Sequence, residues 1–296
     1  MSIRGSIAAY SYNDSSSGSG SRIIAIRDVR KENGWRDVPI NSNRPVEALL
    51  ADGDSFYCYS GHRLFLVDTA TNTHIDHPVE WGPGMGGFPM LARLAPSVVA
   101  LGCSKARSLF VAREGGVECL ATPYSGLTAL SGHGGKLLVA ANDSFSVRMH
   151  DADGREVRSF VGHTHFVRGV AGADESTFLT RSDDGTVRLW DVRAPLYTLA
   201  IAASATAVAG SGNFVVAGLN SKAVGVVDIR AEKAALCVPT QDYYPEEIGF
   251  DAASDELLMF GIIARENGKD SMVFVDNEGQ SHKRVFRRYK TFTSLD

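Results

Sequence analysis

Few side chains in this sequence have types and spacings that could support catalysis or ligand binding. The nearest approach to a metal site is the segment 74–77, His-Ile-Asp-His, but the sequence around it offers too few further ligands. The glycine-rich segment 82–88, GPGMGGF, follows no strand-to-helix pattern, which favours a loop over a nucleotide site. No phosphate-loop, zinc-protease or nucleophile-elbow motif occurs, and no nucleophile is paired with a base. We therefore predict a protein that is not an enzyme and uses no cofactor and no metal.

The composition is that of an ordinary globular protein. Of the 296 residues, 44% are hydrophobic and 22% are charged, and the net charge of -4 gives no general attraction to nucleic acid or to an anionic membrane. No apolar run reaches the roughly 18 residues of a membrane span, and the first residues lack the apolar core of a signal peptide. We expect a cytoplasmic or nuclear protein without a membrane partner. The four cysteines form no CxxC pair, and Cys58 and Cys103 lie in apolar runs, as expected of buried free thiols.

The elements that would position any functional side chain are repeated. One short strand-like pattern, which ends in Asp or in a residue at the matching position, recurs at intervals of 40, 45, 38, 40, 37 and 48 residues. The copies are RIIAIRD (22–28), RLFLVD (63–68), SLFVAR (108–113), VRMHD (147–151), VRLWD (187–191), VGVVD (224–228) and MVFVD (272–276). Most intervals are close to the period of about 40 to 45 residues of four-stranded propeller blades.

The residues around each copy fit a unit of four short strands. The clearest unit has strand candidates at 166–173, 176–182, 186–192 and 195–201, separated by Gly, Asp, Ser or Pro. The same layout recurs over 126–161 and 205–240, and long helical periodicity is almost absent. Antiparallel strands without covering helices predict sheets that pack radially around an axis.

The clearest unit also carries a distinctive set of polar residues. Gly162-His163 precedes its first strand, Asp184 lies in the turn between its second and third strands, and Trp190-Asp191 closes the third. With the period, these residues resemble the WD40-repeat family over essentially the whole chain. The resemblance implies an all-β, seven-bladed β-propeller, and in one blade a buried, structural hydrogen-bond chain. The residues at the matching positions of that chain are His163, Thr180, Asp184 and Trp190.

The other copies depart from this pattern, because at the Trp position they carry Arg27, Val67, Ala112, His150, Val227 and Val275. We therefore expect most blades to be held by apolar packing alone. Only two strands, near 4–12 and 22–29, are predicted before Asp28, so we expect residues 289–296 to supply the missing strand and to close the ring. The predicted single domain, 1–296, has blades at 1–40 with 289–296, and at 46–80, 90–123, 126–161, 166–201, 205–240 and 245–288.

Binding surfaces are predicted at the loops. In the family, the loops that join the fourth strand of one blade to the first of the next, and the second strand to the third, form the top face. Aromatic residues in these loops fit a partner-binding rim: Trp81, Phe88, Tyr124, Phe145, Tyr243 and Tyr244. The flanking Asp242, Glu246 and Glu247 indicate a peptide or protein partner with some basic character. The alternative is that several of these side chains pack loops onto the blade ends.

On the bottom face, three arginines follow the third strands: Arg30, Arg193 and Arg230. The segment WDVR resembles the WDxR box of propellers that serve as substrate receptors of cullin-4 ubiquitin ligases. Such arginines could grip carboxylates of an adaptor, or each could pair with the Asp that precedes it, which the single full WDxR copy favours.

A third class of function is suggested by HKRVFRRYK (282–290), where basic residues alternate with aromatics, as in RNA-binding segments. A charged edge strand that discourages aggregation explains the same pattern, and we favour it. The sequence thus predicts a non-enzymatic scaffold that binds other proteins or peptides within a larger complex. The alternatives are a ubiquitin-ligase substrate receptor and an RNA-associated subunit.

Overall fold

The computed structural model describes the backbone over most of residues 2–287. The described ranges are 2–4, 7–13, 22–28, 35–40, 42, 44, 46–52, 55–68, 73–79, 87–105, 108–113, 116–121, 124–194, 197–202, 204–211, 214–229, 233–239, 243–251, 256–263, 269–275 and 281–287. Side chains are described within residues 38–248, with gaps. Within these ranges the chain forms strands, turns and bends and no helix, so the predicted all-β class is confirmed.

The strands form four-stranded antiparallel sheets, each built from four consecutive strands. The first three sheets hold β1 (Ser2–Arg4), β2 (Ile7–Asn13), β3 (Arg22–Asp28) and β4 (Trp35–Ile40); β5 (Val46–Asp52), β6 (Ser55–Ser60), β7 (Arg63–Asp68) and β8 (Thr73–Pro78); and β9 (Pro89–Ala95), β10 (Val98–Cys103), β11 (Ser108–Arg113) and β12 (Gly116–Ala121). The fourth and fifth hold β13 (Leu127–His133), β14 (Lys136–Ala141), β15 (Val147–His150) and β16 (Glu156–Phe160); and β17 (Val167–Gly172), β18 (Thr177–Ser182), β19 (Thr186–Asp191) and β20 (Tyr197–Ala202). The sixth and seventh hold β21 (Ala205–Ser211), β22 (Phe214–Leu219), β23 (Ala223–Asp228) and β24 (Lys233–Pro239); and β25 (Tyr243–Asp251), β26 (Glu256–Ile263), β27 (Lys269–Val275) and β28 (Ser281–Arg287).

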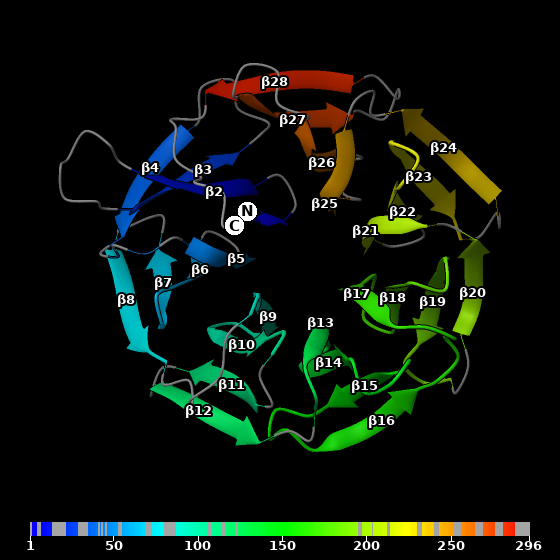
Figure 1. Ribbon diagram of the computed structural model, residues 1–296, viewed down its shortest axis with the longest axis horizontal. Coiled ribbons are helices and arrows are strands. Elements are labelled where there is room, and N and C mark those ends of the chain that lie inside the picture. The colour runs from blue at the N-terminus through cyan, green and yellow to red at the C-terminus, as the bar shows by residue number, and fades with distance from the viewer. Residues whose placement is uncertain are drawn as a thin grey trace.

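The sheets are arranged around a common axis, as in a β-propeller. Figure 1 shows the first strand of each sheet near the axis and the fourth strand at the outer edge. The first sheet lies between the second and the seventh, because β1 approaches both β5 and β25. We refer to the sheets as blades one to seven in chain order.

The predicted arrangement of blade one is wrong in one respect. We expected its innermost strand to come from residues 289–296, but β1 occupies that place and pairs with β2. The register joins Arg4 to Ile7, so only two residues separate the two strands. A strand of three residues shows too little alternation to be recognised in a sequence. Residues 289–296 themselves lie outside the described part of the chain.

The core lies between neighbouring sheets. Second strands such as β14 are buried along nearly their whole length, because both faces of a blade are covered by adjacent blades. Between blades four and five, one apolar cluster includes Leu138, Phe160, Phe178 and Trp190. Similar clusters join blades two and three, three and four, and five and six. Cys58 and Cys103 are buried in this packing, whereas Cys119 and Cys237 are exposed, and none of the four forms a disulfide.

A repeated backbone contact fixes the loops of the top face. Among the described residues, four blades share one contact: the residue that follows the second strand donates its N–H to the carbonyl of the residue that precedes the first strand. These bonds are Ser104 N to Phe88 O (3.1 Å), Asn142 N to Gly126 O (2.9 Å), Asp183 N to Phe166 O (3.0 Å) and Asn220 N to Ser204 O (2.9 Å). We call them the loop staples. Each one joins the two loops that meet at the top of its blade.

The close approach of blades three and four generates a stability prediction. A Cβ atom at Gly132 in β13 would lie 1.4 Å from the Arg93 carbonyl oxygen of β9, so no side chain fits there without backbone movement. We expect Gly132→Ala to lower the free energy of unfolding by about 1–3 kcal/mol or more in urea denaturation. The matched control is Gly225→Ala, whose Cβ would meet only Leu219 at 3.6 Å. Equal stability of the two variants would contradict this packing.

Candidate functional site

The four polar residues singled out in blade five lie together as one hydrogen-bond chain. Trp190 Nε1 donates to Thr180 Oγ1 at 2.8 Å, and Thr180 Oγ1 lies 2.6 Å from His163 Nε2. His163 Nδ1 lies 2.7 Å from Asp184 Oδ2. The Asp184 carboxylate can only accept, so His163 Nδ1 carries the proton and donates to it. Nε2 of the neutral ring then accepts from the Thr180 hydroxyl, which in turn accepts from the Trp190 indole N–H. Each side-chain donor and acceptor in this hydrogen-bond chain therefore has a partner.

The carboxylate end of this chain is held by further donors. Asp184 also accepts hydrogen bonds from the backbone N–H of Thr164 and from the N–H and hydroxyl of Thr186. Burial by itself would raise the pKa of Asp184, but the hydrogen bonds from Thr186 and His163 outweigh it and lower the pKa to about 2. The Thr180 hydroxyl is fully buried and donates its proton to His163 in a hydrogen bond. The hydrogen-bond chain of blade five therefore offers no accessible nucleophile. It can brace the blade, and nothing in its geometry supports turnover of a substrate.

A second polar brace occurs in blade four, and the sequence reasoning missed it. The Tyr124 hydroxyl is hydrogen-bonded to His150 Nε2, while His150 Nδ1 donates to the Gly154 carbonyl at 3.1 Å. Arg148 lies over the Tyr124 ring at 5.1 Å. Tyr124 is 2% exposed, so its predicted place on an exposed rim is wrong, and burial raises the pKa of its hydroxyl. Blade four is thus not held by apolar packing alone. The available signal was His150 at the Trp position, which offers a polar partner where the other copies except Arg27 are apolar.

The top face carries an exposed aromatic group between blades four and five. Phe145 stacks on His165 with ring centroids 5.7 Å apart and meets Phe166 edge-on at 5.1 Å. We call these three residues the aromatic cluster. Phe145 is 43% exposed and the His165 side chain 52%. Phe145 was a predicted rim residue, whereas His165 and Phe166 were not predicted, and Phe166 had been assigned to the strand candidate 166–173.

The aromatic cluster is held in place by its neighbours. The Ser182 hydroxyl donates to the His165 carbonyl at 3.1 Å, and the loop staple from Asp183 holds the Phe166 carbonyl. Arg168 lies 5.3 Å from the Phe166 ring and pairs with Asp183 at 2.7 Å. The exposed rings therefore stand on a fixed backbone next to a charged pair.

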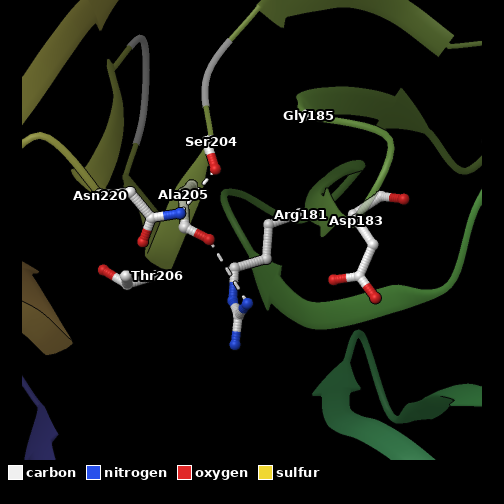
Figure 2. Close-up of a pocket in the computed structure, with 8 residues that line it drawn as sticks. Arg181, Asp183, Gly185, Ser204, Ala205, Thr206 and Asn220 are labelled. Atoms are coloured by element: carbon white, nitrogen blue, oxygen red, sulfur yellow. Dashed lines mark hydrogen bonds between the residues drawn. The ribbon is translucent and has the colours of Figure 1, made fainter.

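A polar cleft of about 560 Å³ opens beside this cluster, between blades five and six. It is lined by Arg181, Ser182, Asp183, Gly185, Ser204, Ala205, Thr206 and Asn220. Figure 2 shows Arg181 between Thr206 and Asp183, with Asn220 and Ser204 above it. Asn220 Nδ2 donates to Ser204 Oγ at 2.6 Å, and Arg181 Nη1 reaches the Ala205 carbonyl at 3.4 Å. Asp183 lines the cleft and also contacts the aromatic cluster, since its N–H donates to the Phe166 carbonyl at 3.0 Å and its carboxylate lies 3.6 Å from His165 Nδ1, so the cleft and the cluster are adjacent.

The remaining predicted rim residues are only partly described. Phe88 is 83% exposed, and Tyr244 is 48% exposed with Lys222 Nζ at 5.6 Å from its ring. Trp81 and Asp242 lie outside the described residues. For Tyr243, Glu246 and Glu247 the backbone is part of β25, but their side chains lie outside the description.

On the bottom face, Arg193 forms a local pair. Its Nε and Nη2 atoms donate to the two carboxylate oxygens of Asp191 at 2.9 and 2.6 Å, and this pairing lowers the pKa of Asp191 to about 2. This is the alternative that the sequence favoured over an adaptor-binding arginine. Arg30 and Arg230 lie outside the described residues. In the basic segment 282–290, the side chains and the last three residues lie outside them too.

Comparison with known proteins finds a family match over the residues that form the polar chain of blade five. Residues 154–191 match the family described as WD domain, G-beta repeat. The chain is 33% identical over 92 residues to the ribosome biogenesis protein YTM1 of Candida albicans. This alignment covers 28% of this chain and 20% of that protein. It is 27% identical over 111 residues to the nuclear distribution protein nudF of Aspergillus terreus, with coverage of 33% and 25%. YTM1 of Scheffersomyces stipitis is 30% identical over 93 residues, with coverage of 28% and 20%.

The matches to these relatives are partial. The chain aligns with about a fifth to a quarter of the length of the curated relatives. No helix long and apolar enough to cross a membrane is present among the residues that the structure describes.

Removal of one hydroxyl tests the brace of blade five. Thr180→Val keeps the shape of the side chain but leaves the Trp190 N–H and the His163 Nε2 atom without a partner in a buried site. We expect a loss of about 1–3 kcal/mol in the free energy of unfolding. The control is Thr128→Val, since the Thr128 hydroxyl is buried without a hydrogen-bond partner in the described structure, and its removal should be neutral or stabilising. If both variants melt alike, the chain does not brace the blade.

The pH dependence of stability tests the state of His163. Burial lowers the pKa of His163 from 6.5, against an opposing effect of Asp184, so the unfolded chain binds more protons below that value. The stability that His163 contributes is therefore complete above pH 6.5 and is lost as the pH falls toward its lower pKa in the folded protein. In urea titrations from about pH 7 to about pH 5, we expect His163→Gln to flatten the decline in stability. A slope unchanged by His163→Gln would contradict the assignment.

Proposed function

We propose that this chain, a WD40-repeat protein built from four-stranded β-sheets, is a non-enzymatic scaffold that binds other proteins through its top face. The whole of residues 1–296 would act as one propeller domain. The observation that carries the proposal is the exposed aromatic cluster of Phe145, His165 and Phe166, which stands on a stapled backbone beside a polar cleft. Aromatic anchors supply much of the energy of protein interfaces.

The rigidity of this surface supports binding of a partner. Association requires loops and side chains to be ordered, and a loop that is already fixed avoids part of that cost. The loop staples hold four top-face loop pairs, and the Ser182 hydroxyl holds the loop of the aromatic cluster. The buried polar chain of blade five contributes to the same rigidity, so its role in the proposal is structural.

The names of the relatives favour a place in a multiprotein assembly. Two of the three similar proteins are named as ribosome biogenesis proteins and one as a nuclear distribution protein. We propose that this chain works in the nucleus or cytoplasm as a subunit of such a complex. An RNA-containing assembly is a second candidate, since the ribosome biogenesis names point to one.

Substitution within the aromatic cluster tests the binding surface. Phe145→Ala together with Phe166→Ala removes two rings on the top face, so we expect proteins that copurify with the wild-type chain to be reduced at least about tenfold, the loss typical of an anchor residue. The measurement is quantitative mass spectrometry after affinity purification. The control, Ile75→Ala, removes a side chain that is 57% exposed on the outer strand β8 and should capture the same proteins as wild type. Unchanged capture by a folded double variant would exclude this surface.

A further inference from the structure

The cleft between blades five and six contains a cation, Arg181, that forms no ion pair with any residue that the structure describes. The Arg181 guanidinium is partly buried, and the one hydrogen bond that it forms among the described residues, from Nη1 to the Ala205 carbonyl, is long at 3.4 Å. Among the described residues no carboxylate forms an ion pair with Arg181. The nearest acidic residue in the cleft, Asp183, is already paired with Arg168 at 2.7 Å.

The fold makes room for this side chain. Arg181 in β18 pairs with Gly169 in β17, and a Cβ at Gly169 would lie 2.7 Å from Arg181 Nε and 2.9 Å from its Cγ. The absence of a side chain at Gly169 therefore lets the stem of Arg181 lie across β17 and carry the guanidinium into the cleft. Burial lowers the pKa of Arg181, with Asp183 opposing and Arg168 adding to the effect, as expected of a cation that has lost water without gaining a partner.

The chemistry of the cleft favours a carboxylate as the missing partner. A guanidinium binds a carboxylate through two parallel hydrogen bonds, and the hydroxyl of Ser204 and the amide of Asn220 line the same space. A chain of phosphates fits less well, because Asp183 stands in the cleft and the protein as a whole is acidic. The aromatic cluster lies at the Asp183 edge of the cleft and can take an apolar side chain of the same ligand.

We propose that this cleft binds the carboxylate of an Asp or Glu side chain in a peptide segment of a partner protein, while a nearby apolar residue of that segment packs on the aromatic cluster. This inference rests on the proposed function and specifies the partner of the same surface. It differs from the sequence interpretation of the rim near Tyr243, where flanking acidic residues indicated a basic partner.

A structural role is the competing explanation for Arg181. If its contact with Ala205 joined blades five and six, loss of the side chain would lower the melting temperature and leave peptide binding unchanged. If Arg181 serves a ligand, Arg181→Met should keep the wild-type melting temperature or raise it, because a partly desolvated charge is removed.

The experiment is selection from a library of random dodecapeptides displayed on phage, with the wild-type protein as bait and Arg181→Met in parallel. We expect wild type to enrich peptides that contain Asp or Glu within a few residues of an aromatic or aliphatic residue, and the variant to lose the acidic preference. The strongest peptide is then synthesised with Glu or Asp, and with the matching amide, for fluorescence anisotropy. The amide peptide on wild type, and the acidic peptide on Arg181→Met, should each bind about tenfold more weakly, with little further loss in combination.

Two further variants separate charge from position. Gly169→Ala keeps the charge of Arg181 but displaces its stem, so we expect weaker binding of the acidic peptide by a folded protein. Arg193→Met makes the same chemical change at an exposed arginine that is paired with Asp191, and should bind as wild type does.

The outcomes distinguish this inference from the function on which it rests. Selected peptides that need Phe145 but show no acidic preference, or that bind Arg181→Met as well as wild type, would overturn the carboxylate site and leave the scaffold function standing. If wild type selects no peptide at this surface, and neither Phe145→Ala nor Arg181→Met changes binding, the carboxylate site and the scaffold function are both overturned. Preferential binding of a single-stranded RNA oligonucleotide, lost in Arg181→Met, would assign the cleft to nucleic acid and also overturn the inference.

Discussion

Burial of both faces of each sheet is the constraint on which the rest of the structure depends. A four-stranded antiparallel sheet has two faces and two edges, and here the neighbouring sheets cover the faces. This packing makes the second strands apolar along their length, as in β14, and requires glycine where backbones come closest, as at Gly132. Once the faces are committed to packing, the loops at the blade ends are left for recognition.

Burying a polar group in such packing costs free energy unless the group has a hydrogen-bond partner. Blade five meets this condition with a chain from Trp190 to Asp184, and blade four does so with Tyr124 and His150. The two solutions use different residues near the outer end of the third strand, since His150 is the last residue of β15 and Trp190 the last but one of β19. Arg181 differs from these side chains, because within the described part of the chain it is partly buried with one long hydrogen bond and no ion pair. That difference separates the side chains that brace the blades from the one that we assign to a ligand.

The sequence was most informative about repetition. Strand endings such as Val-Asp at 67–68 and Trp-Asp at 190–191 recur because each third strand meets the same environment, so the all-β class and the four-strand unit could be predicted. It was least informative about contacts between distant residues. Tyr124 was predicted in an exposed loop, but its ring packs in the apolar cluster between blades three and four and its hydroxyl is hydrogen-bonded to His150. β1 was missed because three residues show no period, and Arg181 because its role depends on the glycine that faces it across the strand pair.

The central claim is that the top-face loops form a fixed platform before any partner arrives. The most direct test is hydrogen exchange, in the free protein, of the amides that form the loop staples: Ser104, Asn142, Asp183 and Asn220. The account predicts that these four amides exchange as slowly as those of the strands they follow, with opening free energies close to that of the sheets. Exchange at the rate of an unstructured loop, with protection only after a partner binds, would show that binding orders the loops and would contradict the account.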